Sequence, residues 1–215
     1  MERAALDALG RDQPELAGCL ADLAEAAARI LATLGAAGTL FVCGNGGSMA
    51  DSLHIAGELK KSFERPRPLP DPVRARLAAQ PDGAELALHL EAGLRVLALG
   101  SDPVLASAAD NDLGARHAGF AQELVALGRP GDALLVVTTS GRSANVTNAA
   151  LVARALDMAV VVLTGAGPPT ALTDLAQVVV RAPATATAEV QGWHRPLYHA
   201  LCRVLEDTAF PTPAD

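Results

Sequence analysis

The chain has 215 residues and a formal net charge of −7, and its only lysines are Lys60 and Lys61. Hydrophobic residues make up 50% of the sequence and aromatic residues only 3%, so the core must consist mainly of Ala, Leu and Val, as in helices packed on a parallel sheet. The acidic charge excludes a broad surface that attracts nucleic acid, and an anionic ligand must be held by arginine, hydroxyl and backbone N–H groups. We therefore expect a globular α/β enzyme with one core.

The cysteines and the N-terminus indicate the compartment. Cys19, Cys43 and Cys202 are far apart and odd in number, which fits buried thiols in a reducing compartment better than disulfides or a Cys-based metal site. The first twenty residues carry acids throughout and lack the apolar stretch of a secretory signal, and no later segment offers about 18 apolar residues free of charges and turn signals. These features predict a soluble, cytoplasmic protein.

The N-terminal part of the chain predicts a helix, a strand and a second helix. Apolar residues recur at helical spacing over 14–36, within an N-terminal helical segment of about 1–37. A short apolar strand over 39–43 follows and runs into a glycine-rich turn. Ser48 stands where an N-cap would begin the next helix, over about 49–63.

The segment 64–93 is the least regular part of the sequence. Four prolines within 64–72 require extended or turning backbone, and the Ala/Leu-rich stretch 73–90 predicts one or two short helices. We interpret 64–93 as a helical insertion within the fold.

Beyond residue 93, short apolar strands alternate with helices. Strands are predicted over 94–100, 133–138, 158–165 and 177–182. Helices are predicted after Pro103, over 120–127, up to about 156 and over 188–207. Loops are predicted at 109–112 and, with Pro168 and Pro169, between the strands 158–165 and 177–182. This alternation predicts a single domain over 1–215 with a doubly wound α/β fold, in which helices flank a five-stranded parallel sheet.

Two strand-to-helix turns are rich in small and hydroxylated residues. The first contains Asn45, Gly46, Gly47 and Ser48, and the second contains Thr138, Thr139, Ser140 and Ser143. Ligands of open parallel sheets bind at the carboxyl ends of strands, where helix N-termini present free N–H groups, so the second turn predicts a phosphate cradle. Gly, Ser and Thr are also ordinary turn residues. Neither turn matches a dinucleotide fingerprint or a P-loop, which makes a nucleotide the weaker ligand hypothesis.

Imidazole, carboxylate and amide side chains form a second group of candidates. His54 and Glu58 lie four residues apart, so on a helix they share one face and can share a metal ion or a proton-transfer task, although such a pair is often only a surface pair. Gln191, His194 and His199 recur on the predicted last helix. Spacing does not choose between the two histidines, and a buried structural histidine is the alternative reading for either.

A short polar pair follows the second predicted strand. Asn111 and Asp112 lie on the predicted loop, where they are candidates to contact sugar hydroxyls or simply to form a turn.

Together these residues resemble the sugar isomerase (SIS) domain family and, within it, the phosphoheptose isomerase branch. The matching segments are 43–59, 109–114, 138–146 and 191–199, which occur in the expected order over almost the whole chain. The loop at 138–143 is typical of SIS domains generally. The combination of His54 and Glu58 with Gln191 and His199 is specific to the isomerase branch.

The resemblance implies a role for each matched residue. The zinc ligands, one ion per subunit, would be His54, Glu58, Gln191 and His199, with Glu58 and His199 also the catalytic acid/base pair. The phosphate would be held by Thr138, Thr139, Ser140 and Ser143, and the sugar chain would meet Asn45, Gly46, Gly47, Ser48, Asn111, Asp112 and Gln191. The resemblance also implies a homotetramer with active sites at subunit boundaries, and a sugar phosphate rather than nucleic acid or a membrane as the partner.

The implied reaction is a metal-assisted aldose–ketose isomerisation, with sedoheptulose 7-phosphate converted to D-glycero-D-manno-heptose 7-phosphate in heptose biosynthesis. Such an exchange moves a proton between C1 and C2 through an enediol, which an acid and a base can perform while a cation stabilises the oxyanion. One alternative is a non-catalytic SIS-domain adaptor that binds a replication-initiator protein, whose C-terminal part resembles the run at 207–211. Such adaptors lack the counterparts of Glu58 and His199. Another alternative is an isomerase of a different sugar phosphate.

The chain departs from the branch at three points. Ala188 stands where an aspartate is common, and the segment 66–93 is longer than in the enteric-type enzymes. Pro196 lies between two proposed ligands and predicts a start or a kink of the last helix. These differences bear on substrate choice more than on the type of reaction.

Overall fold

The computed structural model describes residues 2–211, in which five parallel strands form one sheet in the order β2-β1-β3-β4-β5. The strands are β1 (Leu40–Cys43), β2 (Val96–Ala98), β3 (Ala133–Val137), β4 (Ala159–Gly165) and β5 (Val178–Ala182). Every residue of β1 and β3 is buried, because both strands lie inside the sheet and are covered from both sides. The doubly wound α/β fold with a five-stranded parallel sheet is therefore confirmed.

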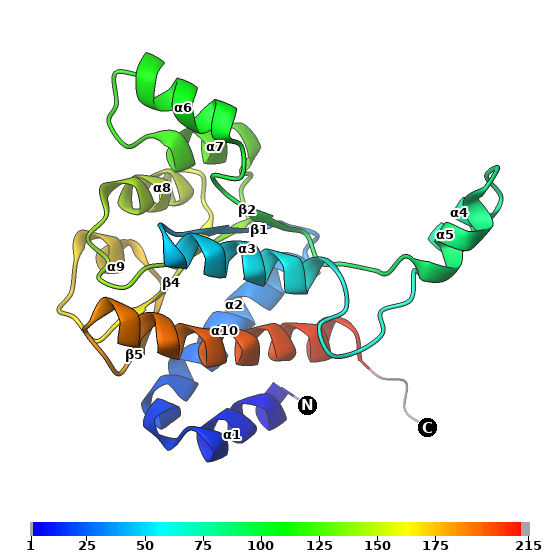
Figure 1. Cartoon of the computed structure of the whole chain (residues 1–215), viewed down its shortest axis with the longest axis horizontal. Helices are drawn as coiled ribbons and strands as arrows, with labels where there is room; N and C mark the ends of the chain where they lie inside the picture. The colour runs from blue at the N-terminus through cyan, green and yellow to red at the C-terminus, as the bar shows by residue number, and fades with distance from the viewer. Residues whose placement is uncertain (1, 212–215) are drawn as a thin grey trace.

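Helices cover both faces of the sheet (Figure 1). One face carries α2 (Leu20–Gly35), α3 (Gly47–Lys60) and α10 (Thr187–Ala209). The other face carries α7 (Gly119–Leu127), α8 (Ala144–Ala155) and α9 (Ala171–Leu175), with α6 (Pro103–Asp112) packed on α7. Each face of the sheet has its own hydrophobic core, and the side chains of β1 point alternately into one core and the other, because successive side chains of a strand lie on opposite faces.

The N-terminal segment contains more elements than the single helix predicted over 14–36. It consists of α1 (Glu2–Asp12), a 3₁₀ helix η1 (Pro14–Cys19) and α2. Pro14 begins η1 at a position where a missing N–H group costs little, and this interrupts the helix. As a result α1 turns back and packs against α10, near the other end of the chain (Figure 1).

The last helix, predicted over 188–207, spans Thr187–Ala209 and runs without interruption through Pro196. Of the two alternatives predicted for this proline, the helix start is therefore wrong. Proline removes the hydrogen bond to the carbonyl of Gly192, which is exposed and can be hydrated. A long apolar face buried against the sheet and α3 stabilises α10 despite this loss.

Most of the segment 64–93, from residue 68 to residue 91, forms an arm that projects from the body of the molecule (Figure 1). It contains the two short helices α4 (Asp71–Ala78) and α5 (Gly83–His89), in agreement with the predicted one or two. No residue of α4 is buried. The base of the arm is closed by a hydrogen bond of 2.7 Å from the Ala92 N–H to the Arg67 carbonyl and by a bridge between Pro68 and Glu91.

Three local predictions are wrong. Residues 109–112 form the last turns of α6 and not a loop, because the Asp102 side chain accepts hydrogen bonds from the N–H groups of the first turn and starts this helix. Gly46, not Ser48, is the N-cap of α3. The helix α9 lies in a segment predicted to be a loop, where Thr170 forms a capping box with Thr173.

Within residues 2–211, no helix is both long enough and apolar enough to span a bilayer.

Candidate functional site

The strand order places a crevice between the loops that leave β1 and β3. Because β1 lies between β2 and β3, the chain returns past β1 after forming β2. The loops after β1 and β3 then lead to α3 and α8, which pack on opposite faces of the sheet. Two neighbouring loops that lead to opposite faces of a sheet leave a crevice between them, and this is where α/β proteins with an open sheet bind their ligands.

A pocket of about 340 Å³ occupies this crevice, and we call it the loop pocket. It is lined by Asn45, Gly46, Gly47, Ser48, Thr138, Thr139, Ser140, Ser143, Thr187 and Gln191. The structure thus brings together every candidate from the two turns and adds two residues of α10. None of the lining side chains is a lysine, an arginine or an acid, so hydroxyl, amide and backbone groups supply the polar contacts.

Close backbone packing shapes the loop pocket. A Cβ atom at Gly44 would lie 2.6 Å from the Ser48 carbonyl oxygen and 2.7 Å from that of Val137, so only glycine lets the two strand ends approach this closely. Ser143 is the N-cap of α8, yet its hydroxyl makes no capping hydrogen bond. That hydroxyl and the N–H groups of Ala144 and Asn145 are therefore available to an anion, whereas the Val146 N–H donates to Asn145 Oδ1 at 3.0 Å.

The amides of Asn45 and Asn145 hold the two loops together. Each side chain donates to the other, at 2.8 and 2.7 Å. Sequence reasoning misses Asn145 as a site residue, although it lies within the segment 138–146 that carries the family resemblance.

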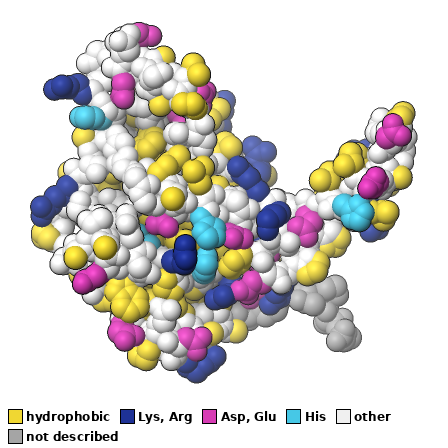
Figure 2. Space-filling model, in the orientation of Figure 1, with side chains coloured by type: hydrophobic (Ala, Val, Ile, Leu, Met, Phe, Trp, Pro, Cys, Tyr) yellow, Lys and Arg dark blue, Asp and Glu magenta, His cyan; other side chains and the backbone are white. Residues whose placement is uncertain are grey.

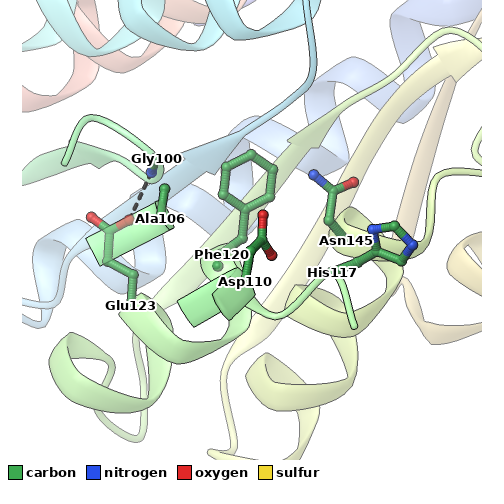
Figure 3. Close-up of a pocket in the computed structure, with 8 residues that line it drawn as sticks. Gly100, Ala106, Asp110, His117, Phe120, Glu123 and Asn145 are labelled. Atoms are coloured by element: carbon green, nitrogen blue, oxygen red, sulfur yellow. Dashed lines mark hydrogen bonds between the residues drawn. The ribbon is translucent and has the colours of Figure 1, made fainter. Parts of the chain in front are cut away.

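A second pocket, of about 130 Å³, adjoins Asn145 (Figure 3). The side chains of Asp110, His117, Phe120 and Asn145 surround it, and Glu123 is occupied by a 2.7 Å hydrogen bond from the Gly100 N–H. The polar pair Asn111 and Asp112, at the C-terminal end of α6, does not share the position of its neighbour Asp110 in this pocket. Asn111 and Asp112 are exposed, hydrogen bond to each other at 2.7 Å and line neither pocket. Their contact with the sugar stays a prediction.

Imidazole and carboxylate groups gather where α3 packs against α10, and Figure 2 shows histidine and acidic side chains at the middle of this face. We define the histidine cluster as His54, Glu58, Tyr198 and His199. His54 Nε2 lies 2.8 Å from Glu58 Oε1, and His54 Nδ1 lies 3.1 Å from the Tyr198 hydroxyl. The rings of His54 and His199 are 5.2 Å apart between centroids. Glu58 and His199, which are distant in sequence, thus belong to one cluster.

The structure separates the two histidines that spacing leaves equivalent. His194 is completely buried, neither ring nitrogen makes a well-formed hydrogen bond, and burial lowers its pKa to about 4 although the nearby Thr164 backbone favours the charged ring. His199 lies in the cluster, where its Nε2 atom has no hydrogen-bond partner. Burial, followed by the charges of His54 and Arg203, lowers the pKa of His199. His199 is therefore the functional candidate, and His194 is the buried residue of the alternative reading.

Sequence reasoning also misses Asp51 and Tyr198. Burial raises the pKa of Asp51, while a hydrogen bond with Tyr198 and the charge of Arg195 oppose this rise. Burial likewise raises the pKa of Tyr198. Both residues were detectable, because Asp51 precedes His54 by three residues on a helix and the only tyrosine of the chain stands next to His199.

The donor atoms of the histidine cluster have the chemistry of a divalent metal site. Two imidazoles and one carboxylate are common zinc ligands, and a second partner such as Tyr198 often holds the other nitrogen of a ligating histidine. The buried Nε2 atom of His199 also lacks a partner. The side chains are not arranged as a coordination shell, since His54 Nε2 contacts Glu58, and within residues 2–211 no three His, Cys, Asp or Glu side chains form a group that could hold an ion.

Gln191 lines the loop pocket and lies on the same helix as Tyr198 and His199 of the histidine cluster. A Cβ atom at Gly47 would lie 2.5 Å from the Nε2 atom of Gln191. On α10 Gln191 precedes His199 by roughly two helical turns, so both residues lie on similar sides of the helix.

Comparison with known proteins identifies the relatives of this chain. The SIS domain family matches residues 83–165. The chain is 35% identical over 193 residues to the phosphoheptose isomerase of Rhodospirillum rubrum, covering 89% of this chain and 88% of that protein. Among solved structures, a phosphoheptose isomerase from Neisseria gonorrhoeae superposes with a TM-score of 0.69 at 30% identity, covering 94% of this chain and 96% of the other. One from Francisella tularensis gives 0.71 at 28%, covering 95% and 96%.

Proposed function

We propose, from the premise that this chain belongs to the phosphoheptose isomerase family, that it converts sedoheptulose 7-phosphate to D-glycero-D-manno-heptose 7-phosphate. The protein is an aldose–ketose isomerase of a sugar phosphate. The observation that carries the proposal is that Glu58 and His199, from helices far apart in the sequence, lie in one cluster, and that the helix carrying His199 also contributes Gln191 to the loop pocket.

The loop pocket holds the phosphate in this proposal. Its hydroxyl groups, contributed by Thr138, Thr139, Ser140 and Ser143, and the N-terminus of α8 can donate to phosphate oxygens without a cationic side chain. The same pocket is lined by Gln191 and by four residues at and before the first turn of α3, namely Asn45, Gly46, Gly47 and Ser48. The carbonyl end of the sugar then lies toward Glu58 and His199.

Glu58 and His199 perform the proton transfers. Isomerisation removes a proton from C1 of the ketose, forms an enediol and returns a proton to C2, while a second proton moves between the two oxygens. A carboxylate and a largely neutral imidazole can divide these tasks, and such general acid–base catalysis contributes about 10²- to 10⁴-fold. Tyr198 holds His54 Nδ1 and so keeps the neighbouring ring in place.

The residues proposed to hold one Zn²⁺ ion are His54, Glu58, Gln191 and His199. Their support is the donor chemistry and the unpartnered His199 nitrogen. A bound zinc ion supplies Lewis-acid stabilisation of the oxygen that becomes negatively charged in the enediol.

The assembly and the cellular setting belong to the same proposal. We expect a cytoplasmic homotetramer that serves heptose biosynthesis, with active sites at subunit boundaries, so Asn111 and Asp112 would reach a site only within that assembly. The net charge of −7 supports a small anionic metabolite held by local donors more than nucleic acid or an anionic membrane.

A panel of ketose phosphates with five to seven carbons tests the proposal. Metal-loaded protein should isomerise sedoheptulose 7-phosphate, with the aldose product identified by NMR. Conversion of only a pentose or hexose phosphate would reassign the substrate. No turnover on any member of the panel, together with binding to a replication initiator, would establish the adaptor alternative, which no structural observation favours.

A further inference from the structure

The segment between α3 and the arm is joined to α10 by ion pairs of very different burial. Glu64 and Arg203 lie 2.7 Å apart, and their side chains are 45% and 39% exposed. Arg67 and Glu206 also lie 2.7 Å apart, but their side chains are 0% and 1% exposed. A buried ion pair is costly to desolvate and is weak evidence of a purely stabilising role, so its other contacts show what it does.

Glu206 uses both carboxylate oxygens to hold the backbone after α3. Oε1 accepts hydrogen bonds from the Phe63 N–H at 2.9 Å and from Arg67 Nε at 2.7 Å, and Oε2 accepts one from the Glu64 N–H at 2.9 Å. Burial alone would raise the pKa of Glu206, but these donors outweigh it and hold the pKa below its usual range. Glu206 is thus an anion that anchors this segment to α10.

Arg67 closes the C-terminal end of α3. Its Nη1 atom donates to the Leu59 carbonyl at 2.9 Å, and its Nη2 atom lies 3.4 Å from the Glu58 carbonyl. The last carbonyls of a helix have no partners within the helix, and a cation there is favourable. The guanidinium therefore binds the backbone of Glu58 itself.

Phe63 connects the same anchor to His199. Its N–H group is held by Glu206, and its ring packs against the His199 ring with centroids 5.3 Å apart. Glu206 follows His199 on α10 by about two turns, so both residues lie on one side of this helix. The Glu206 carboxylate thus holds two residues in place: Arg67, which contacts the Glu58 backbone, and Phe63, which packs on the His199 ring.

We propose that Arg67 and Glu206 are positioning residues that set the placement of Glu58 relative to His199 by fastening the C-terminal end of α3 to α10. This inference rests on the proposed function, in which those two groups share a proton transfer. Neither Arg67 nor Glu206 lines the loop pocket.

The location of the pair predicts a specific kinetic signature. The loop pocket meets α3 at its first turn, whereas Arg67 binds its last turn. Misplacing a catalytic group by about 1 Å can cost about 10²-fold in rate, so loosening the pair should lower kcat by about that factor. Affinity for the phosphate group should change little.

The test uses Arg67→Lys and Glu206→Asp, with Glu64→Gln as the matched control. Arg67→Lys keeps the positive charge but loses the forked arrangement of donors. Glu206→Asp shortens the side chain by one methylene group and so moves the carboxylate away from its partners. The control Glu64→Gln removes an exposed ion pair in the same interface. Three quantities are measured on folded, assembled protein: kcat, the inhibition constant of inorganic phosphate, and the imidazole ¹H–¹⁵N signals of His54 and His199. Circular dichroism establishes folding, and whichever of the two variants is folded carries the test.

In Arg67→Lys and Glu206→Asp we expect a large loss of kcat and shifted imidazole signals, while the inhibition constant of inorganic phosphate stays within about threefold of the wild-type value. The control Glu64→Gln should behave as the wild type. Unchanged kcat and unchanged imidazole signals in a folded variant overturn the proposal. An equal weakening of phosphate inhibition also overturns it, because a general loss of structure then explains the effect. If the wild type itself converts no sugar phosphate, the proposed function fails, while the imidazole signals still decide whether the pair positions the two helices.

Discussion

The loop pocket is lined by neutral hydroxyl, amide and backbone groups from two neighbouring strand ends, whereas the histidine cluster consists of titratable side chains on two helices. Hydrogen bonds to loop backbones and short glycine contacts hold the first region. Ring contacts and a buried ion pair hold the second. An anion can be bound by groups whose charge does not change. Proton transfer requires groups that titrate, and the protonation state of such groups depends on the charges, burial and hydrogen bonds around them. Variants that affect one region and leave the other intact test this division.

The largest expected effect is at the histidine cluster. Glu58→Gln keeps the shape of the side chain but removes its basicity, so kcat should fall by about 10²- to 10⁴-fold or to background. The inhibition constant of inorganic phosphate should stay near the wild-type value. Near wild-type turnover in folded Glu58→Gln would show that this carboxylate is structural.

His199→Ala should cause a comparable loss of turnover and also weaken metal retention, because it removes a proposed ligand as well as a base. Elemental analysis after gel filtration, on preparations whose folding is checked by circular dichroism, measures the retained metal. His194→Ala is the matched comparison on the same helix. A His199→Ala variant that retains both metal and activity would exclude His199 from the site.

The loop pocket should respond in the opposite way. Replacing Ser140 and Ser143 together by alanine removes two donors to the phosphate, each worth about 1.5–3 kcal/mol when the partner is charged. KM and the inhibition constant of inorganic phosphate should therefore rise, while kcat at saturating substrate changes much less. Unaltered KM in the double variant would exclude these serines from phosphate binding.

Gly47→Ala sharpens the comparison, because Gly47 lies against Gln191, which lines the loop pocket and is also a proposed metal ligand. The added methyl group would lie 2.5 Å from Gln191 Nε2, and the flexible amide must move away. We expect a folded protein with a moderate loss, on the order of tenfold, in both kcat and phosphate affinity, since Gln191 is proposed to act in both regions. Exposed Gly57→Ala on the same helix has open space around it and serves as the control.

His194 should matter least for catalysis and should appear instead in the pH dependence of stability. Its pKa is about 4 in the fold against 6.5 for the unperturbed group, so below pH 6.5 the unfolded chain binds a proton that the folded chain excludes. The contribution of His194 to the free energy of unfolding has its full value above pH 6.5 and decreases by up to about 1.4 kcal/mol per pH unit as the pH falls toward 4. Denaturant unfolding of the wild type and His194→Leu at pH 5 and pH 7.5 should show a smaller acid loss in the variant. Equal losses would place the responsible titration elsewhere.

Local sequence was sufficient for the sheet and for the loop pocket. Apolar runs such as 133–137 predict buried parallel strands, and the two small-residue turns at their carboxyl ends meet because neighbouring parallel strands end at the same edge. The pair His54 and Glu58 was equally accessible, since helical spacing alone brings residues four apart together.

Helix packing decided the remainder. Spacing treats His194 and His199 alike, and only the rotation of α10 against the sheet and α3 sends one into the core and the other into the cluster. The partnership of Arg67 with Glu206 is likewise invisible in the sequence, because a charged residue reads as exposed until tertiary contacts bury it. Sequence by itself determined the strands, the turns and the residue types of the chemistry. The tertiary structure decided which distant side chains meet, because short-range periodicity specifies the face of a helix and long-range packing specifies what that face contacts.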